Sequence, residues 1–148
     1  MRSFCWAVKT AAMQNDAAPK DSKAPLGREL SETLAHFQAT GSLYQLPICG
    51  TRYTEGIRYL AQTTKAYWLL TDASVMGKSL MDRSHFVTIH FKRSTQAEKE
   101  TVGYDATINY GDGNGKLLTR QHYHITDFPL DELKLFFVDN TLLLPSEY

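Results

Sequence analysis

The sequence predicts one α+β domain in which N-terminal helices pack on a small antiparallel, about three-stranded β-meander, followed by a C-terminal helix and a short apolar tail. Two observations favour this fold. Apolar residues recur at helical spacing in the first half of the chain, and they alternate with polar residues at a period of two in the second half. The length of 148 residues and the apolar content of 43% suit one domain with its own core.

The first helix is predicted between Glu29 and Ala39. Leu30, Leu34 and Phe37 recur at i, i+4 and i+7, which places them on one face of a helix. This apolar stripe is the side of the helix that we expect to pack on the core, because the residues between the stripe positions are mostly polar or charged.

A second helix is predicted to begin after Thr54, whose hydroxyl suits the N-cap position. Its inward face would be formed by Ile57, Leu60 and Ala61. The apolar run Ala66–Leu70 follows at once, and the helix that it is predicted to open extends to about Val75. Periodicity alone does not separate a buried strand from a buried helix at this length, and the residues after the apolar run favour a third helix.

Two strands are predicted from alternating polarity. In the segment His85–Phe91, the apolar residues Val87, Ile89 and Phe91 share one face. The segment Val102–Tyr110 alternates more cleanly, with polar residues on the opposite face, which is typical of a sheet with one solvated side. The residues expected on its apolar face are Val102, Tyr104, Ala106, Ile108 and Tyr110.

The segment Gly111–Gly115 predicts a hairpin turn, because glycine, aspartate and asparagine tolerate the positive φ of tight turns. A two-residue loop within this segment would place Ile108 opposite Leu117 on the inner face. The same register would place Asp105 opposite Arg120 on the outer face, as a cross-strand pair of opposite charge.

A last helix is predicted after Asp127, which would act as its N-cap, with a proline in the first turn. Its apolar stripe would contain Leu130, Leu133 and Phe137. The segment Leu142–Leu144 is apolar again and predicts a short strand or a buried tail.

Residues 1–28 are predicted to be a disordered extension, and residues 29–148 to be the single domain. Between Gln14 and Arg28 the chain is rich in Asp, Ala, Pro, Lys and Ser, a composition that buries too little apolar area to form a core. The apolar stretch near the N-terminus ends at Lys9, too early for an export signal. No apolar run approaches about 18 residues, so no membrane segment is expected. The two cysteines match no metal-ligand spacing, and we expect them to be free thiols in the cytoplasm.

Five stretches of the chain carry a resemblance to a known family. They occur in this order: Tyr53–Ala61, Ala66–Leu70, Asp112–Gly115, Thr126–Leu130 and Leu142–Tyr148. Together they resemble a family of small bacterial proteins of unknown function that is frequent on plasmids, phages and integrated elements. The resemblance extends from about Leu34 to Tyr148. It implies a mobile-element setting, but no activity, cofactor or catalytic residue.

The leading functional prediction is a non-catalytic protein-interaction domain, with a protein partner or a second copy as the ligand and no cofactor. The candidate binding residues are Tyr53, Tyr59, Tyr67 and Trp68, because tyrosine and tryptophan are enriched at interfaces. The mobile-element resemblance adds the hypothesis of an accessory or anti-defence role. Catalysis is disfavoured because the chain presents no motif that pairs a nucleophile with a base.

The first alternative is a small metal-dependent enzyme or metal-binding module. Alternation places His122 and His124 on the outer face of one strand and His90 on the corresponding face of another, with Asp105 nearby. Neutral imidazole is a ligand for Zn, Ni, Cu and Fe, so convergence of these side chains would create a metal site.

The second alternative is a nucleic-acid-binding module. Sixteen basic and sixteen acidic residues give a net charge of zero, which disfavours nonspecific binding to nucleic acid but permits a local basic patch. Such a patch would require Arg52, Arg58, Lys65, Lys92 and Arg93 to lie on one face.

Overall fold

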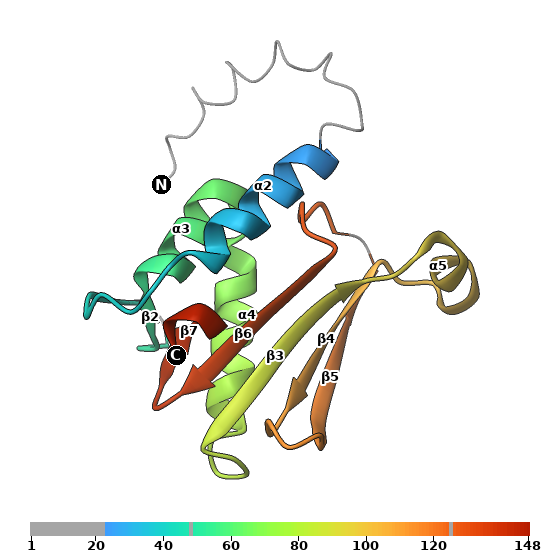
Figure 1. Cartoon of the computed structure of the whole chain (residues 1–148). Helices are drawn as coiled ribbons and strands as arrows, with labels where there is room; N and C mark the ends of the chain where they lie inside the picture. The colour runs from blue at the N-terminus through green and yellow to red at the C-terminus, as the bar shows by residue number, and fades with distance from the viewer. Residues whose placement is uncertain (1–22, 48, 125) are drawn as a thin grey trace.

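A seven-stranded mixed sheet forms the framework of the domain (Figure 1). The computed structural model of the chain describes residues 23–47, 49–124 and 126–148. The strand order is β1-β2-β7-β6-β3-β4-β5, and only the β2–β7 pair is parallel. The predicted three-stranded meander is therefore wrong. The strands are β1 (Leu43–Gln45), β2 (Arg52–Thr54), β3 (Phe86–Arg93), β4 (Ala106–Gly111), β5 (Leu117–Tyr123), β6 (Glu132–Val138) and β7 (Thr141–Leu143).

Three helices pack on one face of this sheet and enclose the hydrophobic core (Figure 1). They are α2 (Lys23–Ala35), α3 (Glu55–Thr64) and α4 (Tyr67–Ser79). The short helix α5 (Gln96–Val102) connects β3 to β4, and a 3₁₀ turn, η3 (Pro145–Glu147), lies near the C-terminus. No described helix is long and apolar enough to cross a membrane.

The three predicted N-terminal helices are confirmed. Leu30 and Leu34 of α2 are buried, as are Ile57, Leu60 and Ala61 of α3, because the apolar stripe of each helix faces the sheet. Helix α2 begins at Lys23, before the predicted start at Glu29. Of the predicted N-terminal extension, residues 1–22 lie outside the described residues, and so does the first cysteine.

The predicted C-terminal helix is wrong, because Glu132–Val138 forms strand β6. Leu133 and Phe137 are four residues apart, so they fit one face of a helix as well as one face of a strand. Leu135 is buried as well, so every second residue from Leu133 to Phe137 is buried, which is the period of a strand. The strand is favoured because β6 lies between β3 and β7, where both edges of its backbone are hydrogen-bonded.

The predicted hairpin is confirmed, but the predicted register of its two strands is wrong, and so are the cross-strand residue pairs that followed from it. Ile108 is buried as expected, yet it lies opposite Gln121, and Leu117 is 47% exposed. The two-residue loop is replaced by a wider turn in which the Asp112 carboxylate accepts hydrogen bonds from the N–H groups of Asn114 and Lys116. These bonds also hold the pKa of Asp112 below its usual value. A bulge next to Tyr110 shifts the pairing further.

The predicted Asp105–Arg120 pair does not form. Asp105 instead contacts the Lys99 ammonium at 2.7 Å and accepts a hydrogen bond from the Thr126 N–H. Both contacts lower the pKa of the Asp105 carboxyl, the Lys99 hydrogen bond most strongly. Asp105 therefore joins α5 to the segment that follows β5.

Helix α5 and the strands β1 and β2 are missing from the sequence prediction. Helix α5 nevertheless has a sequence signal, because Thr95 and Glu98 form a capping box: each side chain accepts a hydrogen bond from the other residue's N–H. Val102, predicted as a strand residue, ends this helix, and Gly103 follows with φ 86°.

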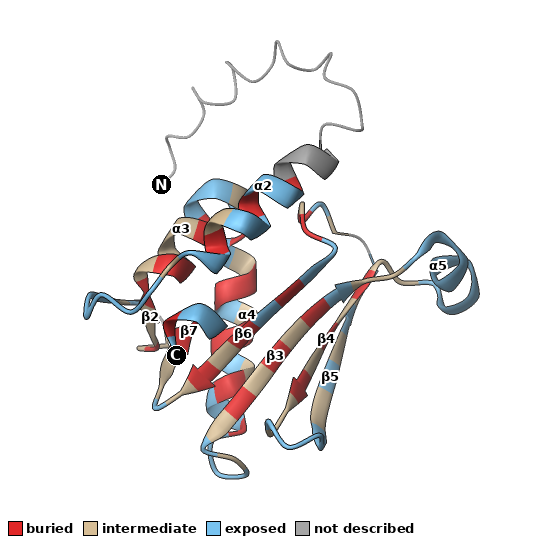
Figure 2. Ribbon diagram, viewed as in Figure 1, coloured by how far each residue is buried: buried red, intermediate tan, exposed pale blue. Residues whose placement is uncertain are grey.

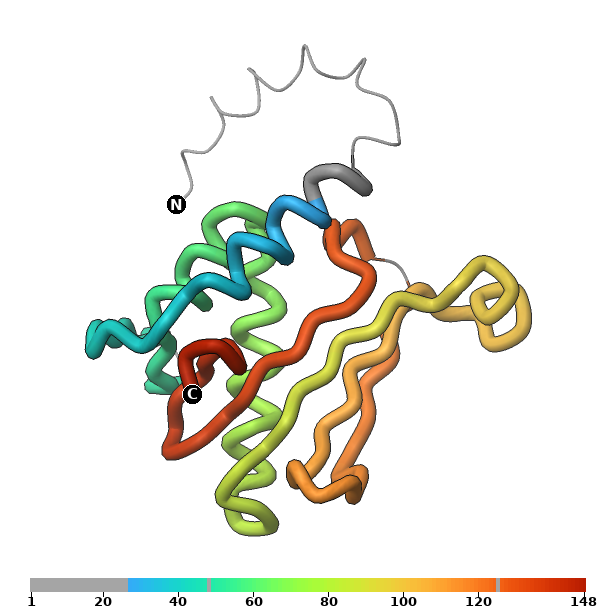
Figure 3. Tube along the Cα trace, in the orientation of Figure 1, coloured from blue at the N-terminus to red at the C-terminus, as the bar shows by residue number. Residues whose placement is uncertain are grey.

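The last strand lies beside β2, which belongs to the first half of the chain (Figure 3). Strand β7, which confirms the predicted short strand, pairs Thr141 with Arg52 and Leu142 with Tyr53 of β2. The segment after β7 then brings Glu147 to the Thr54 hydroxyl, at 2.5 Å. The C-terminal segment is therefore held against β2 by contacts between residues far apart in the sequence.

Substitution of Gly77 by alanine is expected to lower the free energy of unfolding by about 1–3 kcal/mol, although alanine is the better helix former. A Cβ atom at Gly77 of α4 would lie 2.7 Å from ring atoms of Phe137 on β6, and that ring is fully buried. Urea denaturation measures the effect, with the exposed substitution Thr71→Ala in the same helix as the control, which should change the free energy of unfolding by less than about 1 kcal/mol. A stabilising Gly77→Ala would contradict the close α4–β6 contact.

Candidate functional site

We name the side of the sheet that faces away from α2, α3 and α4 the open face. Buried and less buried residues alternate along β3, β4 and β6 (Figure 2). Successive side chains of a strand point to opposite faces, so the neighbours of the buried core residues point to this side. The open face consists of Phe86, Thr88, His90, Lys92, Thr107, Asn109, Arg120, His122, Glu132, Lys134 and Phe136. Most of its residues are polar or charged, so it is the surface of the sheet that is suited to a polar ligand.

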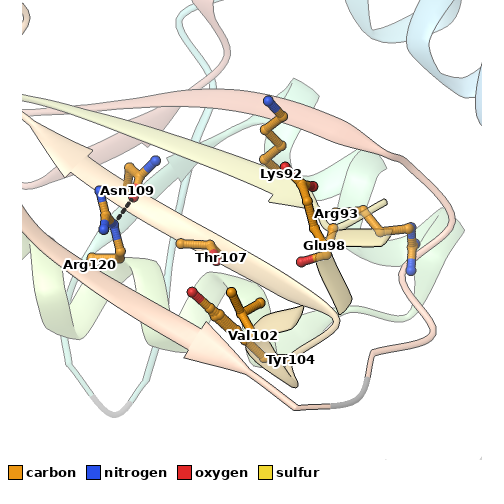
Figure 4. A pocket seen from close by; sticks show the side chains of 9 residues that line it. Lys92, Arg93, Glu98, Val102, Tyr104, Thr107, Asn109 and Arg120 are labelled. Atoms are coloured by element: carbon orange, nitrogen blue, oxygen red, sulfur yellow. Dashed lines mark hydrogen bonds between the residues drawn. The ribbon is translucent and has the colours of Figure 1, made fainter. Parts of the chain in front are cut away.

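A first hollow of about 230 Å³ lies at the end of the open face next to α5 (Figure 4). Lys92, Thr107 and Tyr104 contribute to its walls. At its far end the Arg120 Nε donates a hydrogen bond of 2.8 Å to Asn109 Oδ1. This bond orients the guanidinium, and it is the one side-chain hydrogen bond of Arg120 within the described residues, out of five N–H donors.

A second hollow of about 540 Å³ lies at the opposite end of the open face, beside the turn between β4 and β5. Its walls include Thr88, His90, Lys116 and Lys134, together with glycines of the turn. Asn109 lines both hollows, so they meet at the centre of the open face. The two hollows together follow the strands from α5 to the turn.

The hollows carry more positive than negative charge. Four cationic residues line them and form no ion pair within the described part of the chain: Lys92, Lys116, Arg120 and Lys134. Glu132 lies beside them and contacts the His90 Nε2 at 2.5 Å. Glu98 also lines the first hollow, where its carboxylate accepts the N–H of Thr95 in the capping box, which lowers its pKa.

Aromatic rings lie at both ends of the open face. Phe86 and Phe136, on adjacent strands, have ring centroids 4.8 Å apart, and Tyr148 packs edge-on against both. At the other end, Tyr104 and His122 stack with centroids 4.0 Å apart and an interplanar angle of 17°. Planar groups of a ligand therefore have aromatic partners at either end.

The structure does not bring the three predicted metal ligands together. His90 contacts Glu132, and the His122 Nδ1 lies 3.3 Å from the Thr107 hydroxyl. His124 follows the end of β5, with its Nδ1 3.4 Å from the Gly103 carbonyl. Among the described residues, no group of three or more His, Cys, Asp or Glu side chains is arranged to hold a metal ion.

Among the described residues, no ring contact joins any two of the four aromatic residues predicted to bind a partner, although Tyr67 lies near enough to Tyr53 to help raise its pKa. Tyr53 packs against Tyr44, and Tyr59 packs against Phe37. Burial raises the pKa of the Tyr53 hydroxyl. Tyr67 is 48% exposed at the start of α4. Trp68 packs against two further rings, those of Tyr123 and Phe128.

Of the five basic residues predicted to form a nucleic-acid-binding patch, Lys92 and Arg93 lie together at the first hollow and the other three lie elsewhere. Arg52 lies at one side of the sheet beside Asp139, and Arg58 pairs with Glu55 on α3. Lys65 is the C-cap of α3. Arg93 pairs with Asp131, so only Lys92 joins the open face without an ion pair among the described residues. Of the basic residues that do gather, Lys134 lies on a strand that the sequence did not predict, and Lys116 lies in the turn between β4 and β5.

One comparison with known proteins gives a match. Residues 28–148 match the model of a family described as a family of unknown function, DUF6876. No curated protein and no solved structure matches the chain. The match agrees with the resemblance to an uncharacterised domain that the sequence suggested.

Proposed function

Since the chain belongs to DUF6876, a family of unknown function, its own surface has to indicate its ligand, and we propose that the open face binds single-stranded nucleic acid. One observation carries the proposal. Two hollows that share Asn109 cross the open face, and four cations without ion pairs in the described part of the chain line them. An elongated polar trough with surplus positive charge suits an elongated anion with regularly spaced phosphates.

The charge of the whole chain does not oppose this function, because phosphate contacts depend on the local arrangement of cations. Arg120 and Lys92 lie at the first hollow, and Lys116 and Lys134 at the second. The strand β3 from Phe86 to Lys92 spans roughly 20 Å at about 3.3 Å per residue, so the cations can meet several phosphates of one strand.

A nucleic acid fits the open face better than a protein partner does. The cores of protein–protein interfaces are depleted of lysine and other charged residues, whereas lysines line both hollows of the open face. Bases stack on aromatic side chains, and the open face has the rings of Phe136 and His122 at its two ends. Bases of a single strand are free to stack on such rings, whereas those of a duplex already stack on each other, so a single strand is favoured.

Fluorescence anisotropy with a labelled oligothymidylate of about twelve nucleotides tests the proposal, a length within the usual range of single-strand sites. The variant Arg120→Ala/Lys134→Ala is expected to bind at least tenfold more weakly than the natural chain. The slope of log affinity against log salt should fall by about 0.7 for each lost phosphate contact, and therefore by about 1.4.

The matched control is Arg28→Ala/Arg58→Ala, which removes the same charge from α2 and α3. This variant should retain the affinity and the salt slope of the natural chain. Equal loss in both variants, or no measurable binding at low salt, would overturn the proposal. Tighter binding to a duplex than to the single strand would exclude a single-strand site. Competition by polyglutamate as strong as that by oligothymidylate would indicate an acidic protein partner instead.

The mobile-element setting and an accessory or anti-defence role stay predictions of the sequence resemblance. Nucleic-acid binding is compatible with both, because proteins of mobile elements act where nucleic acids are copied, transferred and attacked. The genes that flank this one in its genome test the setting directly. Genes for plasmid transfer, phage structure or integration on either side would support it, and a purely metabolic neighbourhood would contradict it.

A further inference from the structure

A third hollow, of about 360 Å³, lies away from the open face. It is lined by Trp68 of α4, by Tyr123 at the end of β5, and by Thr126 and Asp127 of the segment that follows. Tyr123 pairs with the core residue Ala106 and so points to the helix side of the sheet, opposite to His122. The hollow is therefore separate from the proposed nucleic-acid site.

Two aromatic rings form the apolar walls of this hollow. The centroids of Trp68 and Tyr123 are 5.2 Å apart, with the rings inclined at 56°. Phe128 meets the indole edge-on, with the centroids 6.3 Å apart, and is itself fully buried. Trp68 is therefore held between the hollow and the core, and its ring is positioned before any ligand arrives.

One carboxylate, that of Asp127, lines the hollow, and a second, that of Asp72, is joined to the hydroxyl of Tyr123. The Tyr123 hydroxyl donates a hydrogen bond of 2.7 Å to Asp72 Oδ2, and Asp127 contributes directly to the lining. Burial and the neighbouring Asp72 carboxylate raise the pKa of the Tyr123 hydroxyl, so Tyr123 stays a neutral phenol. The face of such a ring attracts cations, and the carboxylates add to that attraction.

We infer that this hollow binds the side chain of an arginine from a protein partner. The two rings and the two carboxylates are complementary to a cation with flat faces and several N–H donors. Guanidinium has both properties and is more weakly hydrated than ammonium, so it enters an aromatic hollow at lower desolvation cost than lysine does. This site would account for an interaction through Trp68, one of the residues that the sequence predicted to bind a partner.

The test is a titration of the ¹⁵N-labelled full-length protein with the peptide acetyl-Gly-Arg-Gly-amide, followed by NMR. The Trp68 indole N–H resonance, assigned with Trp68→Phe, should shift in a saturable manner. The lysine peptide should bind more weakly, and the alanine and glutamate peptides should leave the resonance unchanged. Tyr123→Leu should weaken binding of the arginine peptide by about tenfold, the size expected for loss of a cation–π contact.

Two conservative variants distinguish loss of the site from loss of the fold. Tyr123→Phe keeps the ring and should retain most of the binding. Asp127→Asn changes an exposed residue and should weaken binding by about two- to fivefold, as expected for a partly solvated charge pair. Arg120→Ala on the open face should leave peptide binding unchanged. No saturable shift, or equal shifts with the arginine and alanine peptides, would overturn the inference.

Discussion

Replacing Glu147 with alanine is expected to lower the free energy of unfolding by about 3–5 kcal/mol, because it removes a charged acceptor from several buried donors. The Glu147 side chain is almost fully buried, with 4% of the residue exposed. Its carboxylate accepts hydrogen bonds from the Thr54 hydroxyl at 2.5 Å and from the N–H groups of Gly56 and Leu144 at 2.9 and 3.1 Å. Alanine would leave these three donors without their acceptor, and water would reach them only if the C-terminal segment detached.

Urea denaturation followed by circular dichroism measures this loss. Glu147→Gln retains one acceptor oxygen and should lie between the alanine variant and the natural chain. The exposed substitution Glu32→Ala on α2 is the control, and its effect should stay within about 0.5 kcal/mol. A loss below about 1 kcal/mol for Glu147→Ala would show that docking of the C-terminal segment contributes little to stability.

Replacing Ile108 with alanine is expected to lower the free energy of unfolding by about 2–5 kcal/mol, through lost burial and a residual cavity. Ile108 lies in the centre of β4, faces the helices and is 0% exposed. Neighbouring strands flank β4 on both sides, which limits how far the surroundings can collapse into the space.

The matched control for Ile108 is Leu117→Ala. The sequence predicted these two residues as buried cross-strand partners, whereas the structure leaves Leu117 at the exposed start of β5. Leu117→Ala should therefore cost less than about 1 kcal/mol in the same denaturation experiment. Comparable losses for the two variants would favour the predicted register over the observed one.

The sequence alone predicted only part of the candidate site. Alternation in the two predicted strands assigned His90, Thr107 and Asn109 to the solvated face, and the structure confirms these positions. Lys134 joins them only because Glu132–Val138 is a strand next to β3. With that segment taken as a helix, the basic character of the open face could not be recognised, and Lys92 is the one residue of the predicted basic patch that lies on the open face.

The sequence by itself determined helices α2, α3 and α4 and the buried faces of strands β3 and β4, because these depend on spacing within one segment of the chain. The tertiary structure alone decided that Glu132–Val138 is a strand, that the β4–β5 turn is wide, and that β2 pairs with β7. Leu133 and Phe137 fit either period, so backbone hydrogen bonds to β3 and β7 settled their conformation. Such bonds join segments far apart in the chain, and no local pattern of side chains specifies which segments will meet.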